Sequence, residues 1–232
     1  MIASNTLDFT FIKNKLNLKH DELIILGGRP GMGKTLFAIN LLNKSSQKGC
    51  FISLCDSDEE IFYKLEKMNI NSSQSNFDSI CIEQPTLIEL MELVVLQKDK
   101  FDYFVIDDMS GLNEEIEPLF NHNKNYQFVF RHLKLLAKSI DKTIILLSQL
   151  DRIVEEKPHT NRYNIISWKE KYIDHILIIY RMDYYKNIDK KNNMGGTNNA
   201  LLYFAKTKLE KNSIEEVKLN FKYPIWSLTC NN

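Results

Sequence analysis

The chain has 232 residues, 44% of them hydrophobic, and its 30 lysine and arginine residues balance 30 aspartate and glutamate residues. This size suits one large domain with its own core. A neutral chain has no overall attraction to nucleic acid or to a membrane surface, so a DNA-binding surface would have to be a local patch. No apolar run reaches the length of a membrane span, and the four cysteines show no C-x-x-C pairing. We therefore expect a soluble, cytoplasmic protein with neither a zinc site nor a disulfide framework.

A phosphate-binding motif stands near the start of the chain. It follows a short apolar run at residues 23–26, which suits a buried strand, and precedes an apolar helical pattern at 36–42. Residues 28–35 match G-x-x-x-x-G-K-[ST] in every fixed position. In such a loop the backbone N–H groups point inward and hold phosphates at a helix N-terminus. The residues expected to bind a nucleoside triphosphate are Gly28, Arg29, Pro30, Gly31, Met32, Gly33, Lys34 and Thr35.

Two residues of this loop have particular roles. We expect Lys34 to reach the β- and γ-phosphates and the Thr35 hydroxyl to ligate Mg²⁺.

Apolar strand-like runs alternate with helical patterns along the rest of the chain. The expected strands are residues 50–54, 79–82, 103–107, 143–148, 175–180, 200–206 and 217–221; the expected helices begin at Ser57 and cover 87–96 and 126–140. This alternation predicts a single α/β domain over residues 1–232 with a doubly wound, mostly parallel sheet. The last two strands are expected to form an antiparallel hairpin. Residues 154–171 and 186–199 break the pattern and are expected to be loops.

Two polar residues follow apolar strands where they can complete a nucleotide site. One apolar run ends in Asp107, and residues 144–148 form another that leads into Gln149. Because parallel strands present their carboxyl ends to one crevice, we expect Asp107 to hold Mg²⁺ together with Thr35. Gln149 has two interpretations that spacing leaves open: a contact to the γ-phosphate or the attacking water, or a polar residue that merely ends a strand.

Three runs are distinctive beyond the phosphate-binding pattern: G-G-R-P-G-M-G-K-T-L-F at residues 27–37, L-S-Q-L-D-R at 147–152 and I-Y-R at 179–181. In this order they resemble the G-A-R-P-x-M-G-K-T-x-F, L-S-Q-L-x-R and I-Y-R motifs of DnaB-type replicative DNA helicases. The resemblance implies a RecA-like P-loop ATPase that binds ATP and Mg²⁺ and acts on single-stranded DNA in DNA replication. It also implies self-association into a hexameric ring and contacts with other replication proteins. We expect no counterpart of the N-terminal domain and linker helix of those helicases in these 232 residues.

The first departure from the family concerns the carboxylate that polarises the attacking water. The family places S-L-E-M after the strand that follows the loop helix, whereas this chain has S-L-C-D, so Cys55 stands in the position of the glutamate. A neutral thiol is a poor acceptor for a water proton. Asp56 would substitute only if the strand end shifted by one residue. The acidic residues after it fit a capping box, with Ser57 and Glu60 at a helix start.

Two further departures concern groups outside the nucleotide loop. The family's K-x-R, which reaches the γ-phosphate held by the neighbouring subunit, corresponds to Lys206 and Lys208, so the bidentate arginine is replaced by lysine. A solvated strand end is the alternative for both lysines. The family's DNA-contacting D-L-R-E-S-G corresponds to residues 162–167, which lack its central Arg, Glu and Gly. Two interpretations stay open for the basic residues in and near this segment, contact with DNA phosphates or a solvated charged loop; they are Lys157, Arg162, Lys169 and Lys171.

Two principal functions follow from the matches and the departures. The first is a DnaB-like, ATP-hydrolysing DNA helicase motor in which Lys34, Gln149, Lys206 and Lys208 act on the phosphates. The second is a catalytically degenerate relative that binds ATP and serves as a regulatory or helicase-associated subunit. A recombinase- or clock-type RecA-like ATPase is a third alternative, and the R-P and S-Q-L-x-R runs argue against it.

Overall fold

The computed structural model describes residues 9–16, 20–71, 75–113, 122–150, 170–181, 199–207, 215–222 and 225–228. Its helices are α1 (Phe9–Leu16), α2 (Lys34–Asn43), α3 (Asp58–Lys67), α4 (Leu87–Gln97) and α5 (His122–Ile140), with short 3₁₀ helices η2 (Met109–Gly111) and η4 (Glu170–Tyr172). Its strands are β1 (Leu23–Gly28), β2 (Gly49–Ser53), β3 (Phe77–Cys81), β4 (Tyr103–Asp107), β5 (Thr143–Gln149), β6 (His175–Tyr180), β7 (Asn199–Lys206), β8 (Glu215–Lys222) and β9 (Ile225–Leu228). No helix in these ranges is long and apolar enough to cross a membrane.

The nine strands form one sheet in the order β3-β2-β4-β5-β1-β6-β7-β8-β9. The six strands from β3 to β6 are parallel, and β7, β8 and β9 continue the sheet in antiparallel pairs. The predicted doubly wound, mostly parallel sheet and its C-terminal hairpin are therefore confirmed. The structure adds α1 and β9, which the sequence analysis did not anticipate because both are too short for a clear periodic pattern. Most of the expected loops at 154–171 and 186–199 lie outside the described residues.

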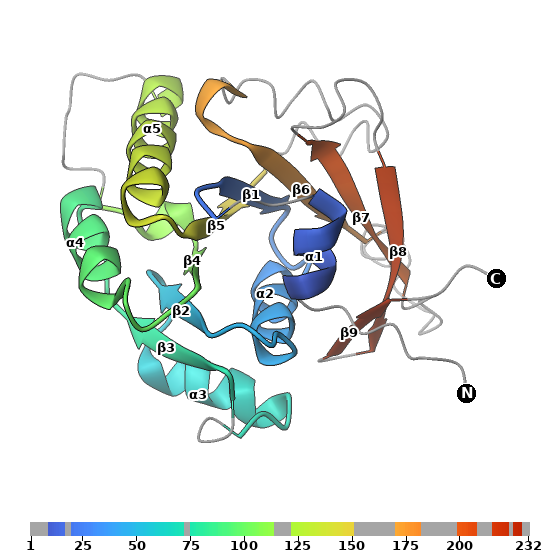
Figure 1. Cartoon of the computed structure of the whole chain (residues 1–232). Coiled ribbons are helices and arrows are strands. Elements are labelled where there is room, and N and C mark those ends of the chain that lie inside the picture. The colour runs from blue at the N-terminus through green and yellow to red at the C-terminus, as the bar shows by residue number, and fades with distance from the viewer. Residues whose placement is uncertain are drawn as a thin grey trace.

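Helices cover both faces of the sheet (Figure 1). Along β1, Ile24 and Leu26 belong to one hydrophobic cluster with residues of α1, α2 and α3, and Leu23 and Ile25 belong to a second with residues of α4 and α5. Successive side chains of β1 thus point to opposite faces of the sheet, as expected for a β-strand. Both faces of the central strands are thus buried, which explains why these strands read as continuous apolar runs in the sequence.

Local sequence signals start two of these helices. At α3, the Ser57 hydroxyl accepts a hydrogen bond from the Glu60 N–H, and the Glu60 carboxylate accepts one from the Ser57 N–H. The predicted capping box is therefore confirmed. Thr86 and Glu89 form the same arrangement at α4. These caps hold the two helices at the same edge of the sheet, just beyond the carboxyl ends of β2 and β3.

The strand register brings the predicted site residues to one edge of the sheet. Gly28 at the end of β1 lies opposite Gln149 at the end of β5, and Ser53 at the end of β2 lies opposite Asp107 at the end of β4. The N–H of Leu54 donates to the carbonyl of Asp107 at 2.7 Å, which continues the pairing past the strand end. The carboxyl edge of β1, β5, β4 and β2 is therefore a continuous row of strand ends.

We expect Gly49→Ala to lower the free energy of unfolding by about 1–3 kcal/mol, because the added methyl overpacks the core. A Cβ at Gly49 would lie 2.2 Å from Cδ2 of Leu42 and 2.9 Å from Cζ of Tyr103. Denaturant unfolding checks the prediction, with the exposed Ser46→Ala as a control that should change stability by less than about 0.5 kcal/mol. Equal stability of Gly49→Ala and the parent would contradict it.

Candidate nucleotide site

The phosphate loop connects the end of β1 to the start of α2. Gly31 and Gly33 adopt φ values of 76° and 86°, in the left-handed region that side chains with a Cβ rarely occupy. Gly33 is the N-cap of α2, and no side chain caps this helix end. A helix start without a side-chain cap leaves its N–H groups directed at the space before the helix, which is the arrangement that binds phosphate.

Lys34 lies folded back over this loop. Its side chain is mostly buried, and Nζ donates to the carbonyl oxygens of Gly28 at 3.0 Å and Arg29 at 3.4 Å. Burial lowers the pKa of the ammonium group, an effect opposed by the carboxylates of Asp108 and Asp107. A buried ammonium group held by neutral carbonyls gains strongly from an anion, so Lys34 is placed to bind phosphate.

Asp107 carries the most perturbed carboxyl group of this edge. Its side chain is buried, and Oδ2 has no hydrogen-bond partner within the part of the chain that the structure describes. Burial raises the pKa of the carboxyl group to about 6, while a hydrogen bond with the Thr35 side chain lowers it and the negative charges of Asp108 and Asp56 raise it further. A buried, partly unsatisfied carboxylate beside a hydroxyl is a donor set that Mg²⁺ fits, because the ion supplies the missing charge and contact.

Arg29 and Gln149 connect the phosphate loop to the end of β5. The Arg29 guanidinium donates to the carbonyl of Leu150 at 2.6 Å, and the Leu150 N–H donates to the carbonyl of Gly28 at 3.2 Å. Arg29 therefore anchors the loop in addition to any contact with nucleotide. Gln149 is exposed at the end of β5, opposite Gly28 at the start of the phosphate loop.

Cys55 and Asp56 occupy the turn after β2. Cys55 is exposed, but its sulfur packs close to Gly111 of η2, and this loss of solvent raises the pKa of the thiol despite hydrogen bonds with the Asp108 backbone and the Ser110 side chain. Asp56 accepts a 2.5 Å hydrogen bond from Nζ of Lys64 on α3. Use of Asp56 as a proton acceptor would therefore compete with an ion pair.

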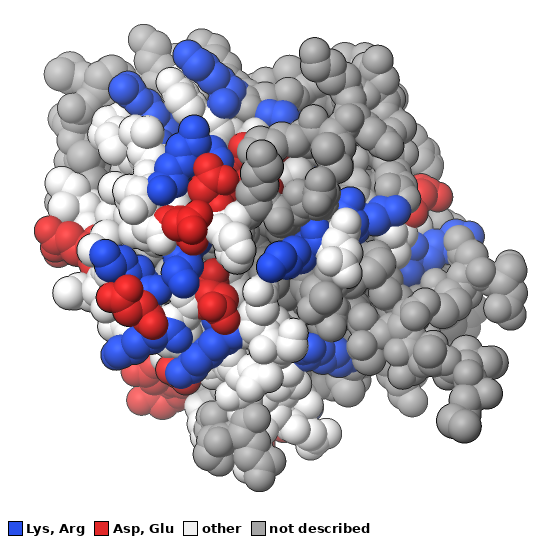
Figure 2. All heavy atoms as spheres, in the orientation of Figure 1, with Lys and Arg blue, Asp and Glu red and all other residues white. Residues whose placement is uncertain are grey.

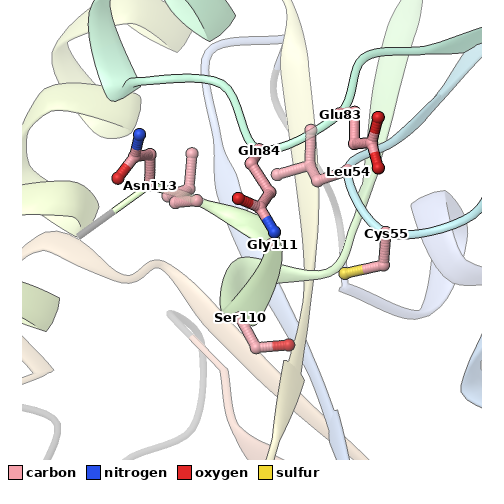
Figure 3. Close-up of a pocket in the computed structure, with 8 residues that line it drawn as sticks. Leu54, Cys55, Glu83, Gln84, Ser110, Gly111 and Asn113 are labelled. Carbon is pink, nitrogen blue, oxygen red and sulfur yellow. The ribbon is translucent and has the colours of Figure 1, made fainter. Parts of the chain in front are cut away.

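A pocket of about 340 Å³ opens beside Cys55, between the carboxyl ends of β2 and β3 and the helix η2 (Figure 3). Glu83, Gln84 and Asn113 are polar residues of its lining that the sequence analysis did not single out. The one sequence signal for Glu83 was its position just after the β3 strand, which pairs in parallel with β2. No motif marks such a residue, because the pocket joins segments far apart in sequence.

Two of the remaining candidate residues, Lys206 and Lys171, lie within the described part of the chain. Lys206 lies at the opposite edge of the sheet, paired with Ile176 at the start of β6, and its Nζ donates to the carbonyl of Ile173 at 2.6 Å. Lys208 lies outside the described residues, as do Lys157, Arg162 and Lys169 of the expected DNA loop, whereas Lys171 is exposed in η4.

A family model for the DnaB-like helicase C-terminal domain matches residues 8–113 and 64–228 of the chain. The chain belongs to the DnaB-like helicase C-terminal domain family. Its similarity to the replicative DNA helicase DnaB of Rickettsia felis is 27% identity over 230 residues, which cover 79% of this chain and 46% of that protein. For the DnaB of Haemophilus influenzae the identity is 27% over 231 residues, covering 80% of this chain and 48% of that protein. The chain therefore spans about half the length of these relatives.

Solved structures show the same RecA-like fold. A solved ATPase domain superposes with a TM-score of 0.77 at 20% identity, covering 98% of this chain and 93% of that one. A DnaB-like replicative helicase studied with its primase interactions gives a TM-score of 0.72 at 22% identity, covering 88% of this chain and 56% of that one. The KaiC-like protein PH0186 of Pyrococcus horikoshii gives a TM-score of 0.63 at 13% identity, covering 91% of this chain and 90% of that one. The family membership thus confirms the resemblance recognised in the sequence, and these structures confirm the fold.

Charge is mixed on the face of this DnaB-like domain shown in Figure 2. Basic and acidic side chains alternate over α3 and its surroundings, where Lys64 pairs with Asp56. The described part of this face therefore has no broad basic surface of the kind that would attract DNA by charge alone.

Asp107→Asn is expected to raise the free energy of unfolding of the metal-free protein near pH 8 by about 3 kcal/mol. Burial raises the pKa of this carboxyl group in the folded state from 3.8 to about 6. Folding therefore favours the protonated form, and its stabilising contribution is lost as the pH rises through 6. A pKa difference of about 2 corresponds to about 3 kcal/mol, and asparagine removes this penalty.

Denaturant unfolding in a chelator checks the expected stability change. The gain should shrink towards pH 4, where Asp107 is protonated in the folded protein. The exposed Asp99→Asn serves as the control. Equal stability of Asp107→Asn and the parent near pH 8 would contradict the prediction.

Proposed function

We propose that this chain is the MgATP-binding motor domain of a DnaB-like replicative helicase and hydrolyses ATP at this site. The observation that carries the proposal is the buried carboxylate of Asp107, whose Oδ2 has no partner among the described residues, beside Thr35 and at the same edge as the folded-back Lys34. Family membership supports the same conclusion.

Each residue of the loop has a distinct task in this proposal. Nζ of Lys34 exchanges its bonds to the Gly28 and Arg29 carbonyls for the β- and γ-phosphate oxygens. Thr35 and Asp107 hold Mg²⁺, which neutralises charge that develops on the phosphates during attack by water. Gln149 contacts the γ-phosphate or orients the attacking water from the neighbouring strand end. The loop glycines bring backbone N–H groups close to the phosphates.

The assembly and the nucleic acid belong to the proposal as well. The DnaB-like relatives are replicative helicases, and we propose that this chain likewise forms a ring, a hexamer by analogy, that moves on single-stranded DNA with other replication proteins. Lys206 and Lys208 would act on ATP held by a neighbouring subunit. The position of Lys206 at the edge opposite its own nucleotide site is compatible with such a contact, provided that its ammonium leaves the carbonyl of Ile173.

A second candidate function is ATP binding without useful turnover, in a regulatory or helicase-associated subunit. The observation that favours it is the turn after β2, where Cys55 presents a thiol of raised pKa and Asp56 is held by Lys64. Neither group is a ready proton acceptor. The two candidates share the MgATP site and differ only in catalysis.

Steady-state ATP hydrolysis with Mg²⁺, measured with and without single-stranded DNA, tests the proposed function. We expect DNA-stimulated turnover that is lost in Lys34→Ala, together with ATP binding weakened about 10- to 100-fold, since a charge-assisted contact is removed. Lys100→Ala, an exposed lysine remote from the loop, should behave as the parent. Tight ATP binding without turnover above the Lys34→Ala level would refute the motor and leave the second candidate.

Cys55→Glu separates the two candidates further. A large gain of turnover on restoring a carboxylate at this position would indicate that the parent lacks its proton acceptor. Little change in turnover is expected if another group already acts as the proton acceptor. The same hydrolysis assay reports both outcomes.

A further inference from the structure

The pocket beside Cys55 is built by three strand ends that are far apart in the sequence. The Ile82 N–H after β3 donates to the carbonyl of Ser53 at 2.9 Å, and the Asn113 N–H after η2 donates to the carbonyl of Pro85 at 2.9 Å. Together with the bond from Leu54 to Asp107, these hold the ends of β2, β3 and β4 side by side. The pocket is therefore a fixed part of the same carboxyl edge that holds the nucleotide site.

The carboxylates near this edge differ in how they are occupied. Asp56 is paired with Lys64, and Asp108 accepts hydrogen bonds from the N–H and the hydroxyl of Ser110. Asp107 is buried beside Thr35, where Mg²⁺ would take it. Glu60 is engaged in its capping box.

Glu83 is different from all of these. It is exposed at the end of β3, lines the same pocket as Cys55, and takes part in no hydrogen bond or ion pair with any residue that the structure describes. Figure 3 shows its side chain on the Cys55 side of the pocket. Unlike the aspartates and Glu60 at this edge, Glu83 lines the pocket with a carboxylate that is not already engaged.

We propose that Glu83 supplies, from the end of β3, the carboxylate that is missing at Cys55, and that it accepts the proton of the attacking water through a water molecule held in this pocket. This inference rests on the proposed ATP hydrolysis. β3 lies one strand beyond β2, a separation of about 4.8 Å, and one bridging water can span this added distance between the Glu83 carboxylate and the attacking water. Polar groups of the lining, Gln84 and Asn113 among them, suit a pocket that holds water.

The step balances without any further reactant. The oxygen of the attacking water forms the bond to the γ-phosphorus as the bond between that phosphorus and the β–γ bridging oxygen breaks, and ADP leaves with the electron pair. One proton of the attacking water moves to the bridging water, which passes a proton to the Glu83 carboxylate. Glu83 then releases this proton to solvent. Cys55 remains a neutral thiol throughout, packed against Gly111.

The test compares Glu83→Gln with Glu92→Gln in the full chain, since Glu92 is an exposed carboxylate of α4 that does not line the pocket. We expect Glu83→Gln to lower kcat roughly 100-fold or more while leaving the affinity for a fluorescent ATP analogue within about twofold of the parent. Glu92→Gln should match the parent. Cys55→Glu added to Glu83→Gln should restore turnover, because it returns a carboxylate to the adjacent strand end.

Four results from the variants would overturn the inference. They are turnover of Glu83→Gln within about twofold of the parent, loss of ATP binding along with turnover, failure of Cys55→Glu to restore turnover, and loss of turnover in Asp56→Asn with Glu83→Gln unaffected. A parent that binds MgATP without hydrolysing it also overturns the inference and leaves the nucleotide site intact. A parent that binds no MgATP refutes the proposed function itself, so the two failures are distinguishable.

Discussion

The burial of Asp107 at the end of a central parallel strand is the constraint on which the site depends. A carboxylate in that position destabilises the folded protein unless something compensates its charge, which is why its pKa is raised to about 6. Among the described groups, Thr35 and Lys64 lower this pKa, but burial outweighs them. The sheet therefore holds an uncompensated negative charge at the edge where α2 begins, and a divalent cation bound there would compensate it. Binding and stability are coupled through this one group.

At the opposite edge of the sheet, where β1 and β6 begin, buried charged groups are paired with one another. Lys134 of α5 pairs with Asp174 at 2.6 Å, and Asp174 also accepts the Leu23 N–H at 2.8 Å, so helix α5, β1 and the start of β6 are joined. His175 and Glu22 form a further contact at 3.0 Å with both side chains buried. Such buried pairs contribute more to a defined arrangement than to net stability, because desolvation offsets the attraction. The charged groups of this edge thus find their ion-pair partners within the chain, whereas Oδ2 of Asp107 at the carboxyl edge has no partner among the described residues.

The features that can be predicted from the sequence are those with a local signal. The loop at residues 28–35, the capping box at Ser57 and the apolar strands are each encoded within a few residues, and the structure has all of them. Two hydrogen bonds could not be predicted: the one from Lys206 to the carbonyl of Ile173 and the one from Arg29 to the carbonyl of Leu150. In both, the partners lie far apart in the sequence. Glu83 was missed for the same reason: its neighbours are set by the pairing of β2 with β3.

Parallel sheets make it possible for a lost side chain to be replaced from a neighbouring strand. The ends of β2 and β3 share one edge, are joined by the bond from Ile82 to Ser53, and open onto one pocket. A proton acceptor moved by one strand keeps its height above the sheet and changes only its lateral position, by about 4.8 Å. Proton transfer tolerates that displacement when a water bridges it, whereas direct coordination of a metal ion does not, because ligand distances to Mg²⁺ are fixed at about 2.1 Å. The pair of Thr35 and Asp107 that we propose as metal ligands is therefore held to its positions, while the proposed proton acceptor is free to change strand.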